Sequence, residues 1–307
     1  GMNFNKRLIK FSALSVYLGM TIFFFAVLLS DVKFTTNAFL NTLDFENFMD
    51  KNNFAPLVTV TGTIFAYFSI VILSFGDFSR YVKDEKELKK GNLSLILNLI
   101  IFSFLSVFIV TGSDVFLNQK FSDMDRIFTN PTDIIGKFDS LQITIVVLFF
   151  IIVASASTNL AANYIPSQYS LINFAPSKLS LRSASYLISF CGLLIAIFWL
   201  TILSQIGILS FVDTFGAFFG PLFGVIAADY YLIKNQELSN KDLYSIDEES
   251  AYYYSGGWHI KGVYSLIIGF IFSASTIWNV NLMFLQSYAW IIGAFIAWIT
   301  YYLLAKK

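Results

Sequence analysis

The chain has 307 residues, of which 56% are hydrophobic and 13% are charged, and its 20 basic and 20 acidic residues leave a formal net charge of zero. Soluble domains are usually about 45–50% apolar and about 25% charged, so this composition excludes an ordinary soluble domain and predicts an integral membrane protein. The balanced charge gives no indication of nucleic-acid binding. One cysteine and one histidine exclude a disulfide framework and disfavour a zinc site.

A helix needs about 20 apolar residues to cross the hydrocarbon core of a bilayer, and eight stretches of the sequence meet this requirement. We therefore predict an all-α integral membrane protein without strands. The charged sequence YVKDEKELKK is interpreted as a solvated loop, and the fourth span is expected to stop at Pro166. In chain order, the predicted spans are residues 8–30, 55–75, 92–115, 140–163, 182–204, 207–233, 262–280 and 284–305.

Lysine and arginine are distributed unevenly between the segments that connect these spans. If the N-terminus lies in the cytoplasm and the spans alternate, 15 of the 20 basic residues fall in inner segments and 5 in outer segments. Because inner segments of membrane proteins are enriched in positive charge, we expect both ends of the chain to be cytoplasmic.

The fourth predicted span ends in a polar sequence, ASASTNLAANYIPSQYS, which begins at residue 154. At 100° per residue, Ala154, Ser157 and Thr158 share one helix face, whereas Asn159 and Asn163 lie on roughly the opposite face. Hydroxyl and carbonyl oxygens are suitable ligands for a hard cation such as sodium. A carboxamide both donates and accepts hydrogen bonds, as recognition of an uncharged heterocycle requires. The alternative, that these small polar residues only hold helices together, remains open at this point.

Four stretches carry a family resemblance: GDFSRYVK, STNLAANYIPSQYSLINFAPSKLSLR, GPLFGVIAADYYLIKNQELSNKDLY and YYYSGGWHIKG. Together, and in this order, they resemble motifs of the nucleobase:cation symporter-1 family. That family comprises permeases for cytosine, purines, uracil, hydantoins, allantoin and thiamine precursors. The resemblance extends over most of the chain.

The resemblance implies the LeuT-like fold, a five-plus-five inverted repeat followed by two trailing helices. The eight spans would correspond to helices 5–12 of that fold. Residues 1–54 would then hold the fifth helix and an outer loop, residues 55–235 the second repeat, and residues 236–307 a cytoplasmic loop and the trailing helices. The opening sequence GMNFNKRLIKF resembles the lead-in to the fifth helix, so we expect a C-terminal fragment whose partners include helices 1–4 of the same protein.

The resemblance also implies roles for individual residues. Sodium would be bound by the carbonyl of Ala154 and the hydroxyls of Ser157 and Thr158, and the heterocycle by the amide of Asn163. The sixth helix of the family commonly carries a tryptophan that stacks on the substrate. Phe68 occupies that position here, with Tyr67 beside it, so a substrate ring can still stack, but the indole N–H is absent.

Three residues of the sixth span, Gly216, Gly220 and Pro221, suggest a helix that bends as an outer gate, and close helix packing is the alternative. At the inner side, Asp77 and Arg80 are expected to form a local latch. Asp229 is interpreted as an interface anchor.

From these features we expect a multi-pass protein of the cell membrane that imports a nucleobase or related nitrogen heterocycle with sodium. Coupling to protons, an amino acid or other solute as substrate, and a non-transporting membrane sensor are the alternatives. No set of residues typical of an enzyme active site is present, so an enzyme is not expected.

Overall fold

The structure is a computed structural model, and it describes residues 2–30, 32–42, 51–120, 141–198, 208–243, 245 and 247–306. Its contacts divide the chain into two compact units. Unit 1 combines residues 1–48 and 77–189, and unit 2 combines residues 49–76 and 190–307. The predicted division by inverted repeats stays a prediction.

The predicted fold class is confirmed. The described residues form helices and no strand, and eight of these helical segments are long and apolar enough to cross a membrane. Each of the eight overlaps one span predicted from hydrophobicity. The candidate spans are Arg7–Leu29, Pro56–Leu73, Glu85–Ser113, Thr144–Phe174, Leu181–Phe198, Val212–Ile233, Ile260–Trp278 and Val280–Ala305.

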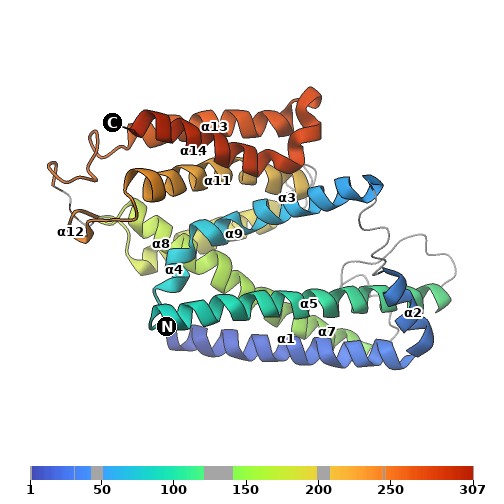
Figure 1. Ribbon diagram of the computed structural model, residues 1–307. Coiled ribbons are helices and arrows are strands. Elements are labelled where there is room, and N and C mark those ends of the chain that lie inside the picture. Colours follow the sequence, from blue (N-terminus) through green and yellow to red (C-terminus); the bar gives the residue numbers. More distant parts are fainter. Residues whose placement is uncertain are drawn as a thin grey trace. The chain divides into compact units, whose positions relative to one another are not determined.

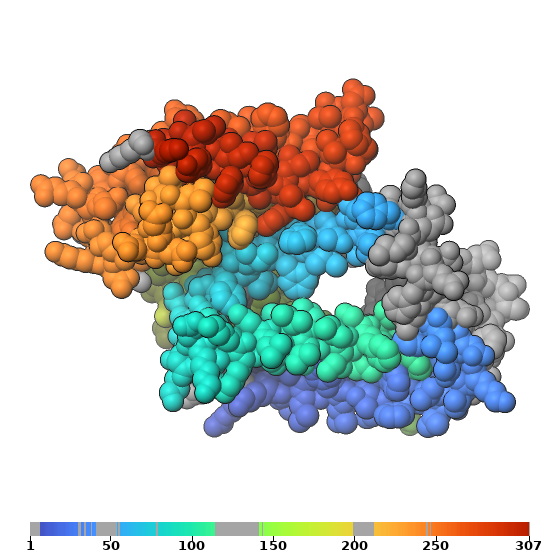
Figure 2. All heavy atoms as spheres, in the orientation of Figure 1, coloured from blue at the N-terminus to red at the C-terminus, as the bar shows by residue number. Residues whose placement is uncertain are grey.

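Unit 1 is built around three long helices, α1 (Met2–Ser30), α5 (Glu85–Lys120) and α7 (Leu141–Asn159). Both α5 and α7 pack against α1, and the short helix α2 (Val32–Thr42) packs against α5 (Figure 1). In the space-filling view, the side chains of α1 and α5 meet along the two helices (Figure 2). Helix α2 lies where the predicted division of the chain placed an outer loop.

Aromatic residues form the core of unit 1. Phe39 of α2 and Phe108 of α5 are buried with Val27 of α1. The rings of Phe24 and Phe108 lie 4.2 Å apart, centroid to centroid. These contacts join the three helices through apolar side chains.

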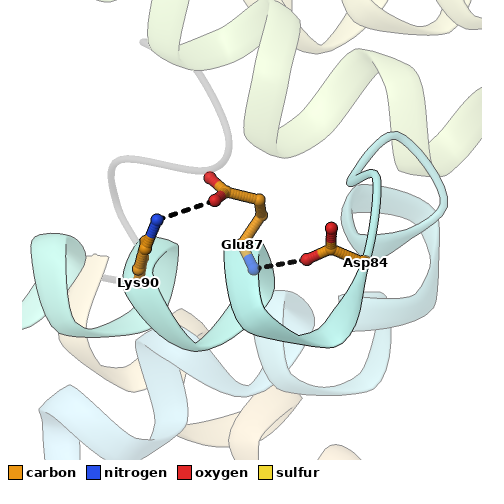
Figure 3. Close-up of polar contacts among 3 residues, drawn as sticks. All are labelled: Asp84, Glu87 and Lys90. Atoms are coloured by element: carbon orange, nitrogen blue, oxygen red, sulfur yellow. Dashed lines mark hydrogen bonds and ion pairs between the residues drawn. The ribbon is translucent and has the colours of Figure 1, made fainter.

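Helix α5 begins earlier than predicted, so the interpretation of YVKDEKELKK as a loop is wrong for its second half. Asp84 precedes the helix and accepts a hydrogen bond of 2.8 Å from the backbone N–H of Glu87, as an N-cap does (Figure 3). Glu87 also pairs with Lys90 at 2.8 Å, and Glu85 with Lys89 at 2.7 Å. The cap and these pairs make a polar, solvent-exposed helix turn favourable before the apolar span begins.

Unit 2 contains α3 (Lys51–Leu73), α11 (Ile208–Ala228), α13 (Ile260–Trp278) and α14 (Ala289–Ala305). Helices α11, α13 and α14 pack against one another, and α3 packs against α11 (Figure 1). The remaining described elements of the chain are short helices and α9: α4 (Phe75–Ser79), η1 (Leu160–Tyr164), α8 (Ile165–Phe174), α9 (Leu181–Phe198), η3 (Asp229–Ile233), α12 (Asn240–Leu243) and η4 (Val280–Tyr288).

Glycines allow α11 to approach α14 closely. A methyl group placed on Gly220 would overlap the backbone carbonyl of Trp290, and one on Gly224 would overlap that of Ala294. Small residues at helix contacts are common in membrane proteins because they let backbones meet where burial of apolar surface gives little driving force.

Candidate functional site

The polar end of the fourth span lies at a change of helix type. Helix α7 ends at Asn159, a π-helical turn (η1) follows over Leu160–Tyr164, and α8 continues from Ile165. The backbone N–H of Ile165 donates to the carbonyl of Leu160, five residues earlier. Single π-helical turns inside α-helices occur frequently at functional sites.

The expectation that this helix stops at Pro166 is wrong. Pro166 is buried in the first turn of α8, and the helical run continues to Phe174. Proline has no N–H to donate, so in this continuous helical run a carbonyl of the preceding turn loses its usual donor. In a membrane helix, a local π adjustment helps to satisfy such freed backbone groups.

Two of the three predicted cation ligands contact each other. The hydroxyl of Ser157 donates to the carbonyl oxygen of Ala154 at 2.9 Å, and Ser157 is buried. The contact agrees with the predicted sharing of one face by these residues. Thr158 follows on α7 with its side chain exposed. Binding of sodium by this group stays a prediction.

The two asparagines of the opposite face also contact each other. The Nδ2 amide of Asn163 donates to Oδ1 of Asn159 at 2.8 Å. The sequence reasoning gave Asn159 no role, although its spacing of four residues from Asn163 is the signal that could have found it. With one N–H of Asn163 donated to its neighbour, the amide can offer its carbonyl oxygen as an acceptor and its second N–H as a donor to a ligand.

Phe68 and Tyr67, the predicted stacking residues, lie next to each other on α3 in unit 2. Their ring centroids are 5.4 Å apart and the ring planes meet at 79°. Because the rings are nearly perpendicular, one flat ligand can stack face to face on only one of them.

The predicted gating residues lie in the packed interior of unit 2. A methyl group on Gly216 would come within 2.5 Å of Cβ of Ala66 on α3, and Gly220 touches the backbone of α14. Pro221 is fully buried and packs against Gly293. These contacts support the alternative of close helix packing, and a gating role stays a prediction.

The expected contact between Asp77 and Arg80 is present at 3.7 Å. The guanidinium of Arg80 also lies over the ring of Tyr169 on α8, 4.3 Å from its centroid. The hydroxyl of Tyr169 shares a hydrogen bond with that of Tyr81, and burial together with this bond raises the pKa of Tyr81 to about 12. The predicted local pair is therefore part of a larger contact that ties residues 77–81 to α8.

These features define a multi-pass, all-helical membrane protein with a polar turn inside one span. The chain belongs to the family of permeases for cytosine/purines, uracil, thiamine and allantoin, whose sequence model matches residues 6–293. This match confirms the family resemblance of the sequence motifs.

The relatives are named permeases and transporters, in agreement with the expectation that the protein is not an enzyme. The chain is 27% identical over 257 residues to the allantoin permease of Bacillus subtilis (strain 168), covering 83% of this chain and 50% of that protein. It is 26% identical over 255 residues to the purine-uracil permease NCS1 of Arabidopsis thaliana, covering 79% and 41%. The chain thus spans about half the length of the curated relatives it matches. A solved structure, the inward-facing conformation of Mhp1, is 19% identical with a TM-score of 0.49, covering 96% of this chain and 74% of that one.

Proposed function

We propose that the whole protein is a secondary active transporter that imports a nucleobase or a related nitrogen heterocycle together with sodium. Membership of the permease family supports transport, and the names of the relatives support an allantoin-like or purine-like substrate. The observation that carries the proposal is the pair of polar contacts at the end of α7, where Ser157 donates to the carbonyl of Ala154 and Asn163 donates to Asn159.

The amide pair is the proposed substrate contact in unit 1. The rings of nucleobases and allantoin carry N–H donors next to carbonyl acceptors, and a carboxamide matches such an edge. The carbonyl oxygen of Asn163 would accept from a ring N–H. In unit 2, Phe68 or Tyr67 would stack on the flat face of the same kind of ligand.

The oxygens of Ala154, Ser157 and Thr158 are the proposed sodium ligands. They carry no net charge, so a bound sodium ion remains able to leave, as a coupling ion must during each transport cycle. Proton coupling is the second candidate, and a proton would not require the hydroxyl of Thr158.

The test is uptake of radiolabelled allantoin and uracil by the full-length protein in proteoliposomes, with and without a sodium gradient. Thr158→Val removes a hydroxyl and keeps the side-chain shape. We expect it to weaken sodium activation at least about tenfold, since a bond to a charged group contributes about 1.5–3 kcal/mol. Asn163→Ala should raise the KM for the heterocycle and leave the sodium requirement in place.

Ser155→Ala is the matched control, because it removes a hydroxyl from the same helix outside both proposed sets, and it should behave like the wild type. Uptake that needs no sodium and follows an imposed proton gradient would show that the coupling ion is the proton and not sodium. Competition by amino acids but not by heterocycles would overturn the proposed substrate class.

A further inference from the structure

A hydrogen-bonded chain of three ionisable residues lies in unit 2, and none of the three is among the residues proposed to bind substrate or sodium. The hydroxyl of Tyr301 on α14 donates to Oδ1 of Asp229 in η3 at 2.6 Å, and its oxygen lies 3.2 Å from Nε2 of His259. Tyr301 is only 1% exposed. Because the single hydroxyl proton is directed at Asp229, the oxygen must accept from His259, so Nε2 of the histidine carries a proton.

His259 ends a segment that leads into α13, residues 250–259, here called the strap. The ring of Tyr254 in the strap stacks on the ring of His259 at 3.9 Å, with 7° between the planes. Tyr254 has a backbone φ of +54°, a conformation that a bulky residue adopts only when its surroundings hold it there. The strap is further attached through Tyr252, whose ring lies 4.7 Å from the ammonium of Lys234.

The surroundings of His259 mostly oppose a positive charge on its ring. His259 is the residue immediately before α13 and makes no side-chain cap, so the positive end of the helix dipole disfavours a cation there. The ring is also partly buried. The charged groups that act on it are Asp229, which favours the protonated ring, and Lys234 and Lys261, which oppose it.

We propose that Asp229, Tyr301 and His259 form a proton-operated clasp, which holds the strap against η3 and α14 while His259 is neutral and releases it when His259 is protonated. Burial, with Lys234 and Lys261, lowers the pKa of His259 below its usual value against the opposing effect of Asp229. The released, hydrated histidine therefore binds a proton more readily than the clasped one. Acid favours release, beginning as the pH falls below about 6.5.

The clasp can be followed with a spin label on the strap of the full-length protein in lipid nanodiscs. Cys191→Ser removes the only cysteine of this chain, and Ser255→Cys places the label on an exposed strap position. We expect an immobilised spectrum at pH 8 and a growing mobile component between pH 6.5 and pH 5. In His259→Gln the amide can still donate to Tyr301 but does not titrate, so the label should stay immobilised throughout.

If the labelled protein that keeps His259 gives the same spectrum from pH 8 to pH 5, the proposal is overturned. The same holds if the spectrum of His259→Gln changes with pH as much as that of the protein with His259. Asp229→Asn provides a second measurement, because it removes the charge that favours the protonated ring. Without that charge the clasped ring binds a proton even less readily than the released ring, so acid favours release more strongly and the midpoint of release should move to higher pH in this variant. An unchanged or lower midpoint would also count against the clasp, and helix content and monodisperse elution show whether each variant is folded.

Discussion

At the residue scale, contacts between neighbours on one helix follow from spacing. Ser157 meets Ala154 three residues away, and Asn163 meets Asn159 four residues away, so their grouping on two faces could be predicted. The contacts of Tyr301 with Asp229 and His259 could not, because they join residues 72 and 42 positions apart. Such contacts depend on how the helices pack, and this packing cannot be inferred from residue spacing along a single sequence.

Gly220 offers a test of packing at one residue. In Gly220→Ala, the new methyl group would overlap the carbonyl of Trp290, so α11 and α14 must separate. Overpacking of this kind costs about 1–3 kcal/mol. We expect a lower midpoint of thermal unfolding in detergent.

Gly192→Ala is the matched control, because Gly192 lies in helix α9 and a methyl group there would meet nothing within 4 Å. Alanine favours the helix over glycine by up to about 1 kcal/mol, so this variant should be unchanged or slightly stabilised. Equal destabilisation by the two substitutions would contradict the packing explanation.

At the scale of the helix, hydrophobicity predicted which segments span the membrane, but local polar groups decided where two helices begin and end. The apolar run predicted α5 from residue 92, whereas the cap at Asp84 starts it at Glu85. Proline predicted a stop at Pro166, whereas the π turn allows the helix to continue. Both errors arise because capping and π turns depend on backbone hydrogen bonds rather than on apolar content.

The start of α5 can be tested by removing its cap. Asp84→Ala leaves the backbone N–H of Glu87 without its side-chain acceptor, at a cost of about 1 kcal/mol to the first turn. Amide hydrogen exchange of residues 85–90 should become faster.

Glu85→Ala serves as the comparison, because it removes the exposed pair with Lys89 and one charge of the first turn but leaves the cap in place. Such pairs contribute about 0.3–0.5 kcal/mol, so the increase in exchange should be smaller. If exchange increases as much as in Asp84→Ala, the cap does not fix the start of the helix.

At the scale of the whole molecule, eight spans and the family could both be recognised from sequence, because hydrophobic length and motif order are properties of the sequence itself. The described residues contain an even number of candidate spans, so both ends of the chain would lie on one side of the membrane if each of these segments, and no other, crosses. From the distribution of lysine and arginine, we predict that this side is the cytoplasm.

Fusions test the orientation. Green fluorescent protein joined after Lys307 should fluoresce in a bacterial host, and alkaline phosphatase at the same position should be inactive, because basic segments are retained in the cytoplasm. Alkaline phosphatase joined after residue 120, beyond the third span, should be active. The opposite pattern at these two positions would show that the predicted orientation is inverted.

The close approach of α11 to α14 limits which amino acids can stand at the contact, and the limits differ from position to position. On α14, the groups in contact are backbone carbonyls of Trp290 and Ala294, which any amino acid supplies. On α11, the contact requires that positions 220 and 224 have no side chain at all. Substitutions at 294 that preserve the helix can therefore leave the contact intact, whereas almost every substitution at 220 or 224 must open it. Tolerance to mutation at this interface is thus lowest at the positions that carry no side chain, which are 220 and 224 on α11 and 293 on α14, where a methyl group would overlap Pro221.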